Sequence, residues 1–273
     1  MISASVIIPF YNNVSFLKLV LAGYRRQSLT DFEVIIADDG SNEESVAAVK
    51  DLMDAYPFKI KHQWHDDDGF RKTIMLNRCI MAASADILIF NDGDCIPHQH
   101  FVKEHISSTK PGTCSTGRRV NLSKTLSNQL TTERIEQGIL DRSHLHFIWA
   151  ELTRSGDNAR QAFYLKTPTL RRWRNKTPKG LLGSNMSIHK QDLLNINGFD
   201  ERYRQPGIGE DTDIDFRLQL NGVTVKTLIH MAIQYHLHHK MLPRPQQNDA
   251  LFATIQQQGT ARTAYGIQKS ASN

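Results

Sequence analysis

The sequence ADILIFNDGDCIPHQHF, residues 85–101, runs from an apolar segment directly into two acidic side chains. The apolar residues 87–90 are typical of a buried strand, and Asp92 and Asp94 follow at once. Gly93 between them lets the backbone turn tightly, so both carboxylates can reach one divalent cation or its water shell. Two ionised carboxylates about 4 Å apart repel by ~4 kcal/mol at an effective dielectric of about 20. We therefore expect a cation beside them.

Strand and helix patterns alternate through the first half of the chain. Buried or alternating apolar residues predict strands over 4–10, 32–40, 58–65 and 86–90, and helical spacing predicts helices over 14–27, 42–56 and 71–84. Such alternation is typical of an α/β fold with a mostly parallel central sheet flanked by helices, whose ligand site lies beyond the carboxyl ends of the strands. That edge would collect the polar residues that follow the strands, namely Tyr11, Asp38, Asp39, Asp92 and Asp94.

The clustering of these acids is the main signal for a site. Asn, Asp and Gly are the commonest turn formers, so the NDGD tetrapeptide alone is also consistent with a plain turn. Acids at the ends of two predicted neighbouring strands favour a metal site instead. Hard oxygen ligands suit Mg²⁺ or Mn²⁺, and a histidine in the ligand set would shift the preference toward Mn²⁺.

Length and composition narrow the class of protein. The chain has 273 residues, 40% of them hydrophobic, which is typical of a globular protein with an ordinary core. Its longest apolar runs are strand-sized, so we expect no membrane span. The N-terminus lacks the features of a secretory signal, and we expect a cytoplasmic protein. The cysteines Cys79, Cys95 and Cys114 form no CxxC pair, which argues against disulfides and a cysteine zinc site.

The net charge of +5 favours anionic partners without choosing among them. The basic residues form no recognised nucleic-acid module, so we expect no nucleic acid partner. They are dense in RQAFYLKTPTLRRWRNKTPKG, residues 160–180, which contains no acid. An acceptor on an anionic lipid or polysaccharide, with peripheral contact at the inner face of a membrane, would explain this segment. A solvated loop over the donor site is equally consistent with it.

The second half is less regular. We predict a polar helix over residues 127–140, a strand over 232–239 and a flexible tail over 259–273. In the strand AIQYHLHH, alternation would place His236 and His238 on one face. The segment GEDTDIDFRLQLNG, residues 209–222, fits either a strand or a helix with an acidic first turn on periodicity alone.

These motifs together resemble the inverting family-two glycosyltransferases of the GT-A fold. The resemblance rests on SVIIPFYNN and VIIADDGS near the N-terminus, ILIFNDGDCI, the GEDTDID segment and the closing YHLHH. It covers residues 3–120 strongly and 181–240 well, whereas 121–180 match no known pattern. It implies a Rossmann-like GT-A domain with a nucleotide-sugar-binding half (1–120) and a smaller acceptor-binding and catalytic half (121–258). Within the second half, residues 121–180 would be a variable basic insertion.

The resemblance also implies roles for individual residues. In the donor site, Tyr11 would flank the base, Asp39 would bind its edge, Asp92 would lie near the sugar or ribose, and Pro9, Asp38, Arg71 and Gly93 would complete the set. Asp94 would bind the metal together with a late histidine, for which we favour His236 while His238 and His239 stay open.

On the acceptor side, Asp211 would be the general base, Glu210 would contact donor sugar or acceptor, and Gly183, Ser184 and Asn185 would line the pocket. The helical alternative for the segment that begins at Glu210 follows from the same resemblance.

The expected function is therefore metal-dependent transfer, with inversion, from a nucleotide sugar, with UDP as the expected nucleotide, to a hydroxyl of a glycan or lipid-linked glycan. The DDGF and NDGDCI segments are similar to those of bacterial glycosaminoglycan, capsule and lipopolysaccharide transferases, which implies a role in surface polysaccharide synthesis. Two alternatives remain. A haloacid-dehalogenase-like phosphohydrolase also starts its chemistry from an Asp-x-Asp strand end, and a catalytically inactive sugar-nucleotide-binding module would keep the same motifs.

Overall fold

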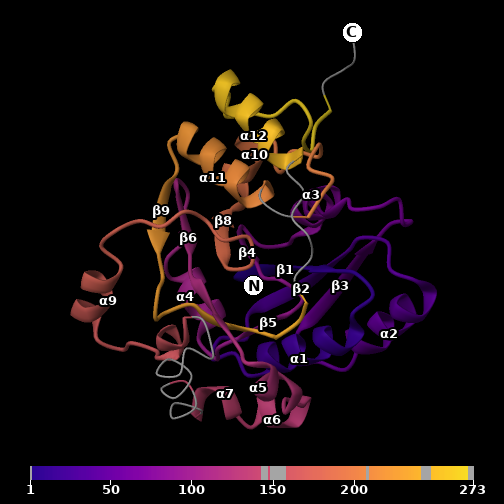
Figure 1. Cartoon of the computed structure of the whole chain (residues 1–273), viewed down its shortest axis with the longest axis vertical. Helices are drawn as coiled ribbons and strands as arrows, with labels where there is room; N and C mark the ends of the chain where they lie inside the picture. The colour runs from indigo at the N-terminus through magenta and orange to yellow at the C-terminus, as the bar shows by residue number, and fades with distance from the viewer. Residues whose placement is uncertain (1, 143–146, 148–157, 207–208, 241–246, 270–273) are drawn as a thin grey trace.

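The computed structural model describes residues 2–142, 147, 158–206, 209–240 and 247–269. Helices cover both faces of a central sheet, and a second, smaller sheet lies against it (Figure 1). The predicted α/β class with a mostly parallel sheet is therefore confirmed. All four strands and three helices predicted for residues 4–90 are present.

The central sheet has the strand order β3-β2-β1-β4-β8-β6-β9. Its neighbours pair in parallel except β8, which runs antiparallel to both β4 and β6. The strands are β1 (Ala4–Phe10), β2 (Phe32–Asp38), β3 (Lys59–Trp64), β4 (Ile87–Phe90), β6 (Thr113–Thr116), β8 (Met186–His189) and β9 (Thr224–Thr227). The division into halves at residue 120 stays a prediction, but strands from both sides of it build this one sheet.

Alternation along the strands divides the core between the two faces. In β1, Val6 and Ile8 pack on one face and Ile7 on the other, because successive strand side chains point in opposite directions. The first face is covered by α1 (Val14–Arg25) and α2 (Glu43–Met53). The second is covered by α3 (Lys72–Ala82), α10 (Lys190–Asn195) and α11 (Glu210–Leu220). Both faces of the sheet are thus buried. A ligand site is therefore expected where the strands end and not on a face of the sheet.

The smaller sheet has the order β5-β10-β7, with β5 (Cys95–Pro97), β7 (Arg118–Asn121) and β10 (Ile233–His236). Its register pairs His236 with Cys95, and Leu237 N–H donates to the Asp94 carbonyl at 2.9 Å. This pairing brings the histidine-rich segment 236–239 next to Cys95, the residue that directly follows Asp94. The backbone therefore brings together two motifs that lie about 140 residues apart in sequence.

The segment 121–180 differs from the prediction. The single helix expected over 127–140 is three short helices, α5 (Lys124–Asn128), α6 (Thr132–Glu136) and α7 (Ile139–Arg142). Thr131 is extended and caps α6 through its side chain, and Gly138 adopts a positive φ of 83°, so each residue interrupts helical geometry. Further along are η1 (Ala159–Ala162) and α9 (Pro168–Arg174).

The flexible C-terminal tail expected over residues 259–273 stays a prediction, but the described residues 259–269 make several contacts with the rest of the chain. Beyond α12 (Gln247–Gln258), Asn197 Nδ2 donates to the carbonyls of Thr263 and Gln268, and Ile267 packs against the core. Composition alone missed these contacts because most of them are made by backbone groups. Within the described ranges, every helix, including α4 (Phe101–Ile106), is too short or too polar to span a bilayer. The three cysteines are free and buried.

Candidate active site

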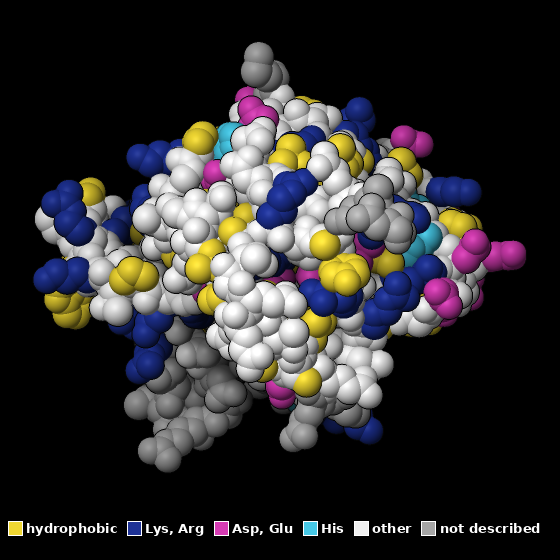
Figure 2. Space-filling view, turned by 90° about the horizontal axis from the view of Figure 1, so that it is seen from above, with side chains coloured by type: hydrophobic (Ala, Val, Ile, Leu, Met, Phe, Trp, Pro, Cys, Tyr) yellow, Lys and Arg dark blue, Asp and Glu magenta, His cyan; other side chains and the backbone are white. Residues whose placement is uncertain are grey.

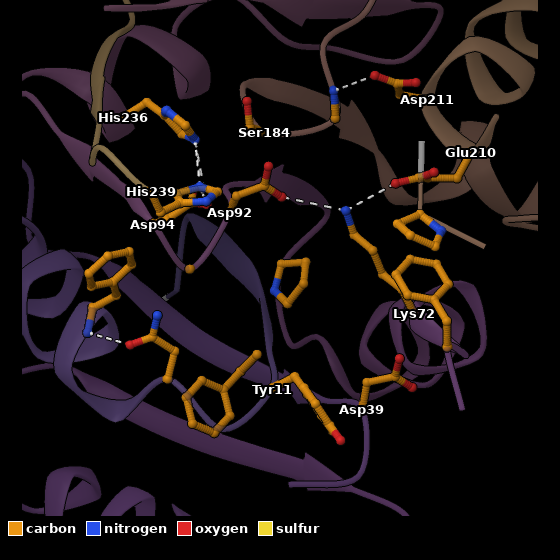
Figure 3. Close-up of a pocket in the computed structure, with 18 of the residues that line it drawn as sticks. Tyr11, Asp39, Lys72, Asp92, Asp94, Ser184, Glu210, Asp211, His236 and His239 are labelled. Atoms are coloured by element: carbon orange, nitrogen blue, oxygen red, sulfur yellow. Dashed lines mark hydrogen bonds and ion pairs between the residues drawn. The ribbon is translucent and has the colours of Figure 1, made fainter. Parts of the chain in front are cut away.

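A cavity of about 920 Å³ lies at the carboxyl ends of β1, β2 and β4 and is bordered on its far side by the residues that precede β8 and by the start of α11. Figure 3 shows its side chains converging from both halves of the chain. Most residues singled out from the sequence line it: Pro9, Tyr11, Asp39, Asp92, Gly93, Asp94, Gly183, Ser184, Glu210, Asp211 and His236. The cavity therefore lies at the carboxyl ends of the strands, where the sequence predicted a site.

Gly93 has a steric reason to be glycine. A Cβ at this position would meet the Pro9 carbonyl oxygen at 2.8 Å, which is closer than real contacts allow. The two strand ends can therefore approach each other only if residue 93 lacks a side chain. This close approach directs Asp92 and Asp94 to neighbouring parts of the cavity.

One end of the cavity carries an aromatic residue and carboxylates. Tyr11 is half exposed, and its hydroxyl donates to Asp67 Oδ2 at 2.9 Å. Asp39 accepts the Arg71 backbone N–H at 2.8 Å and lies 2.9 Å from His65 Nε2. Burial raises the pKa of the Asp39 carboxyl above its ordinary value, although these hydrogen bonds oppose the shift. A flat group could stack on Tyr11 with its polar edge toward Asp39.

Another part of the cavity brings two imidazoles to one carboxylate. Asp94 Oδ2 lies 2.9 Å from His239 Nε2 and 3.5 Å from His236 Nε2, and the two Nε2 atoms are 3.2 Å apart. Burial raises the pKa of Asp94, but the hydrogen bonds from His236 and His239 outweigh it and hold the pKa well below its ordinary value. The hydrogen bond to Asp94 raises the pKa of His239.

The spacing of these three atoms fits a divalent cation. Ligand atoms bound about 2.1 Å from a metal are about 3.0 Å apart at adjacent octahedral corners and about 3.4 Å apart in a tetrahedron. The observed spacings of 2.9 to 3.5 Å cover this range. Cys95 lies beside the set, but burial and the Asp94 charge raise the pKa of its thiol. The protonated thiol donates to Asp94 Oδ1 at 3.2 Å and orients that carboxylate.

A lysine lies between the two acidic motifs. Lys72 Nζ donates to Glu210 Oε1 at 3.0 Å and lies 3.5 Å from Asp92 Oδ1. Burial lowers the pKa of Lys72, but Asp92 and Glu210 outweigh it and hold the pKa above its ordinary value. Glu210 Oε2 is buried and accepts no hydrogen bond from the described residues, so it can accept one from a ligand.

Asp211 lies at the start of α11 and faces the segment before β8. Its Oδ2 accepts the Gly183 N–H at 3.1 Å, and its Oδ1 accepts the Thr212 N–H at 2.8 Å. The helical alternative for residues 210–220 is confirmed. Oδ1 also accepts the Thr212 hydroxyl at 3.4 Å, whereas Oδ2 keeps a free lone pair. Two backbone groups hold the side chain in one orientation at the cavity wall.

Three predicted site residues do not line the cavity in the part of the chain that the structure describes. Asp38 is fully buried, and its oxygens are used by the Ser41 N–H and His62. Arg71 contributes its backbone to Asp39, whereas its guanidinium contacts the Asp66 carbonyl and the Asp68 carboxylate. In each case the adjacent residue lies at the cavity instead, because neighbouring side chains point in different directions.

Asn185 is the third of these residues, and it is structural. Its amide donates to the carbonyls of Arg118 and Ala232, and its oxygen accepts the Gly117 N–H at 3.1 Å. Ser184, the residue before it, lines the cavity and accepts a hydrogen bond from Gln234. Asn185 therefore links the two sheets behind the acceptor side of the cavity.

Several residues at the cavity were not predicted. Some follow predicted positions directly, and a rule that includes neighbours would have found them: Phe10, Lys72 and Thr212. Phe70 and Leu182 directly precede the predicted residues Arg71 and Gly183, and Asp67, Gly69 and Phe70 belong to the DDGF segment. The others carry no such signal, because only the tertiary fold brings them to the cavity: Asn13, Phe16, Arg119 and Pro206. His239 was one of three open candidates, and its Nε2 lies closer to Asp94 than that of His236.

Comparison with known proteins identifies the family. The model of "Glycosyl transferase family 2" matches residues 5–177, and "N-terminal domain of galactosyltransferase" matches 170–240. The first match runs through most of the segment 121–180, for which the sequence motifs gave no resemblance. It also favours a glycosyltransferase over the phosphohydrolase alternative.

Named relatives and solved structures agree with this match. Validoxylamine A glucosyltransferase of Streptomyces hygroscopicus subsp. jinggangensis is 26% identical over 80% of this chain and 52% of its own length. Chondroitin synthase of Escherichia coli is 24% identical over 85% of this chain and 34% of its own length. The chain thus spans about a third to a half of these curated relatives.

Two solved structures share the fold at low sequence identity. The mannosyltransferase PcManGT from Pyrobaculum calidifontis, solved with GDP-Man and Mn²⁺, has a TM-score of 0.56 and 14% identity over 91% of this chain and 59% of that one. S. aureus TarS 1-349 in complex with UDP has a TM-score of 0.51 and 16% identity over 85% of this chain and 59% of that one. The predicted GT-A fold is confirmed, and the chain belongs to glycosyl transferase family 2.

Proposed function

We propose that this chain is a metal-dependent, inverting glycosyltransferase that takes a sugar from a nucleotide sugar, with UDP as the preferred nucleotide, and transfers it to a hydroxyl of a glycan or lipid-linked glycan. The observation that carries this proposal is one cavity that holds Asp94 with two imidazoles at one part of its wall and Asp211 at another. The first set suits a diphosphate-bound cation, and the second suits a base for the acceptor.

The charge of the cavity supports a metal. Among the residues that the structure describes, six carboxylates line it, against two cationic side chains, Lys72 and Arg119. A nucleoside diphosphate would meet an excess of negative charge there unless a divalent cation lay between them. Asp94, His236 and His239 would hold that cation, and mixed nitrogen and oxygen ligands suit Mn²⁺ better than Mg²⁺. The bound cation would supply charge neutralisation at the departing diphosphate.

The donor would extend from Tyr11 toward Asp92. Stacking on Tyr11 and hydrogen bonds at Asp39 suit a pyrimidine base, because each Asp39 oxygen keeps a free lone pair beside its present partner. Two solved structures with a similar fold contain UDP or GDP-Man, which supports a nucleotide donor and leaves the base to experiment. Glu210 Oε2 is available to a donor-sugar or acceptor hydroxyl.

Transfer then requires one base and a stabilised leaving group. The acceptor oxygen attacks the anomeric carbon on the face opposite the diphosphate, the new glycosidic C–O bond forms, and the bond from carbon to the diphosphate oxygen breaks. Asp211 receives the acceptor proton, and the Gly183 and Thr212 N–H groups hold the carboxylate in place. Lys72 forms ion pairs with both Asp92 and Glu210, which offsets the repulsion between these carboxylates and so preserves the shape of the cavity wall.

One relative and the basic segment suggest which acceptor the protein uses and where in the cell it acts. The glycosaminoglycan-synthesising relative supports a polysaccharide product, and we infer a role in bacterial surface polysaccharide synthesis. The acid-free basic segment after residue 158 suits an acceptor held at the cytoplasmic face of a membrane.

Calorimetric titration tests the donor site. UDP and GDP are titrated into the wild type with Mn²⁺ and with EDTA, and then into Asp94→Ala and the exposed control Asp51→Ala. We expect UDP to bind only with Mn²⁺, Asp94→Ala to abolish binding and the control to behave as wild type. Binding of neither nucleotide under any condition would refute the proposal.

A further inference from the structure

Helix α9 is exposed in an unusual way. None of its residues is buried, and Leu170 and Trp173 are 48% and 73% exposed. These two side chains are three residues apart, so they share one face of the helix. A helix of a globular protein ordinarily buries its apolar face, and here that face points to solvent. Two large apolar side chains on one solvent-facing helix mark an interaction site.

The helix is nevertheless held firmly to the body of the protein. Arg171 binds both oxygens of Glu104, at 3.0 and 3.2 Å, and also donates to the Leu165 carbonyl. Asn175 donates to the Ile229 carbonyl at 3.1 Å and accepts the Ile229 N–H at 2.7 Å. The polar side chains therefore anchor the helix while the apolar ones face outward, which is the reverse of an ordinary surface helix.

The chain segment that contains α9 carries basic residues and no acidic ones. Residues 158–191 contain no Asp or Glu, and Lys166, Arg172, Lys176 and Lys179 are exposed there. Figure 2 shows dark-blue basic side chains gathered with yellow hydrophobic ones on the lobe at the left, where Figure 1 has α9. Apolar anchors with a basic surround are the pattern by which peripheral proteins bind anionic bilayers.

We propose that the α9 surface, defined by Lys166, Leu170, Arg172, Trp173, Lys176 and Lys179, docks the protein on an anionic phospholipid bilayer. Trp173 and Leu170 enter the interfacial region, and the lysines and Arg172 contact acidic headgroups. An aliphatic side chain beside the tryptophan favours lipid over a polyanionic glycan, which offers no apolar phase. The chain that leaves α9 reaches the cavity wall at Leu182. Delivery of a lipid-linked acceptor by this route rests on the proposed function, whereas bilayer docking does not.

Vesicle co-sedimentation of the full chain tests the docking. The vesicles contain phosphatidylglycerol with phosphatidylcholine, or phosphatidylcholine alone. We expect the wild type to bind only the anionic vesicles, and the double variant Leu170→Ala/Trp173→Ala to bind at least about tenfold more weakly. Arg172→Gln, Lys176→Gln and Lys179→Gln should each weaken binding about fivefold. Wild-type tryptophan emission should shift to the blue on vesicles, and Trp173→Phe should lose that shift.

Matched controls lie elsewhere on the surface. Met81→Ala and Leu220→Ala remove side chains that are 56% and 46% exposed, and Lys50→Gln removes an exposed charge. These controls should bind vesicles as the wild type does. Binding to dextran sulfate but not to vesicles would overturn the proposal in favour of a glycan partner. Equal binding by the double variant and the wild type, or no binding to anionic vesicles, would also overturn it.

UDP titration of the same double variant tests the proposed function independently of membrane docking. Since α9 does not line the cavity within the described residues, nucleotide binding should be unchanged. A wild type that binds vesicles but no nucleotide would refute the proposed function alone.

Discussion

Lys72 Nζ donates a hydrogen bond to Glu210 Oε1 at 3.0 Å, across 138 residues of sequence. Lys72 is the first residue of α3 and Glu210 the first of α11, so this contact joins the first half of the chain to the second. The same ammonium lies 3.5 Å from Asp92 of the Asp-Gly-Asp motif. One lysine thus connects the two acidic motifs on opposite walls of the cavity.

Replacing this lysine should damage the site more than the fold. In Lys72→Met the carboxylates of Asp92 and Glu210 lose their counter-ion and repel each other, so we expect turnover to fall by about 100-fold. Since these side chains are partly exposed, the free energy of unfolding should fall by only about 1 to 3 kcal/mol. Steady-state kinetics and thermal unfolding measure the two effects.

Two further variants sharpen this test. Lys72→Arg keeps the charge and should retain more activity than Lys72→Met, because a cation still lies between the two carboxylates and offsets their repulsion. Lys50→Met alters an exposed lysine on α2 and should leave turnover unchanged. Wild-type turnover in Lys72→Met would show that the ion pairs contribute nothing to the reaction.

The sequence predicted β1, β2, β3 and β4 of the central sheet because their signal is local, but it did not predict β6, β8 and β9. Residues 4–10 and 32–38 are buried along their lengths, so their apolar composition alone identifies strands. The direction in which a side chain points at a strand end cannot be predicted from local composition in the same way. Asp38 and Asp39 are adjacent in sequence and identical in chemistry, yet only Asp39 faces the cavity, because the pleat turns them to opposite sides.

The same limit explains the other differences. Arg71 and Lys72 are both basic, and the start of α3 decides which of the two side chains reaches the cavity. Asn185 is of a residue type that often binds ligands, but its side chain is fully hydrogen-bonded to backbone groups of two separate segments, Gly117–Arg118 and Ala232. The approach of His239 to Asp94 depends on the turn after β10, where strict alternation ends.

Asp211→Asn should separate chemistry from donor binding. The amide keeps the size of the side chain but cannot accept a proton, so we expect turnover to fall by 10²- to 10⁴-fold. UDP affinity in the presence of Mn²⁺ should stay within about twofold of wild type, because Asp211 lies with the acceptor-side residues. Calorimetry and initial-rate measurements on the same preparation check both statements.

Asp215 provides a control one helical turn away. Its Oδ2 accepts the Leu181 N–H at 3.2 Å, much as Asp211 accepts the Gly183 N–H at 3.1 Å, but Asp215 is not among the described residues that line the cavity. Asp215→Asn should therefore lose the same kind of backbone contact and keep its turnover. Equal losses in both variants would mean that Asp211 acts by holding the loop and not as a base.

The two histidines near Asp94 should both contribute to Mn²⁺ binding. We expect His236→Ala and His239→Ala each to weaken Mn²⁺ binding by about 10- to 100-fold, because each removes one nitrogen from a three-atom set. The electron paramagnetic resonance signal of free Mn²⁺, titrated without nucleotide, measures this directly. His238→Ala is the control, since this residue lies between them in sequence and is exposed. Unchanged affinity in His239→Ala would reduce the set to Asp94 and His236.

Acid should destabilise the protein through a buried histidine behind the cavity. His105 is fully buried on α4, and burial lowers its pKa to about 3. Its Nε2 donates to Asn185 Oδ1 at 3.1 Å, and its Nδ1 accepts from Ser187 Oγ at 2.6 Å. This pattern uses the neutral ring, because a protonated ring could not accept from Ser187.

The sign of the effect follows from proton binding in the two states. Below about pH 6.5 an unfolded histidine takes up a proton, whereas folded His105 stays neutral down to about pH 3. The unfolded state therefore binds more protons, and stability falls as the pH drops through this window, by at most ~1.4 kcal/mol per pH unit. Between about pH 7 and about pH 4.5, urea unfolding should show that the free energy of unfolding falls by roughly 2 to 3 kcal/mol because of this residue.

His105→Gln, which stays neutral and can both donate and accept a hydrogen bond, should flatten that part of the pH profile. Lys103→Gln, at an exposed position of α4, should not. A profile with the same slope in wild type and His105→Gln would show that His105 carries none of the acid sensitivity.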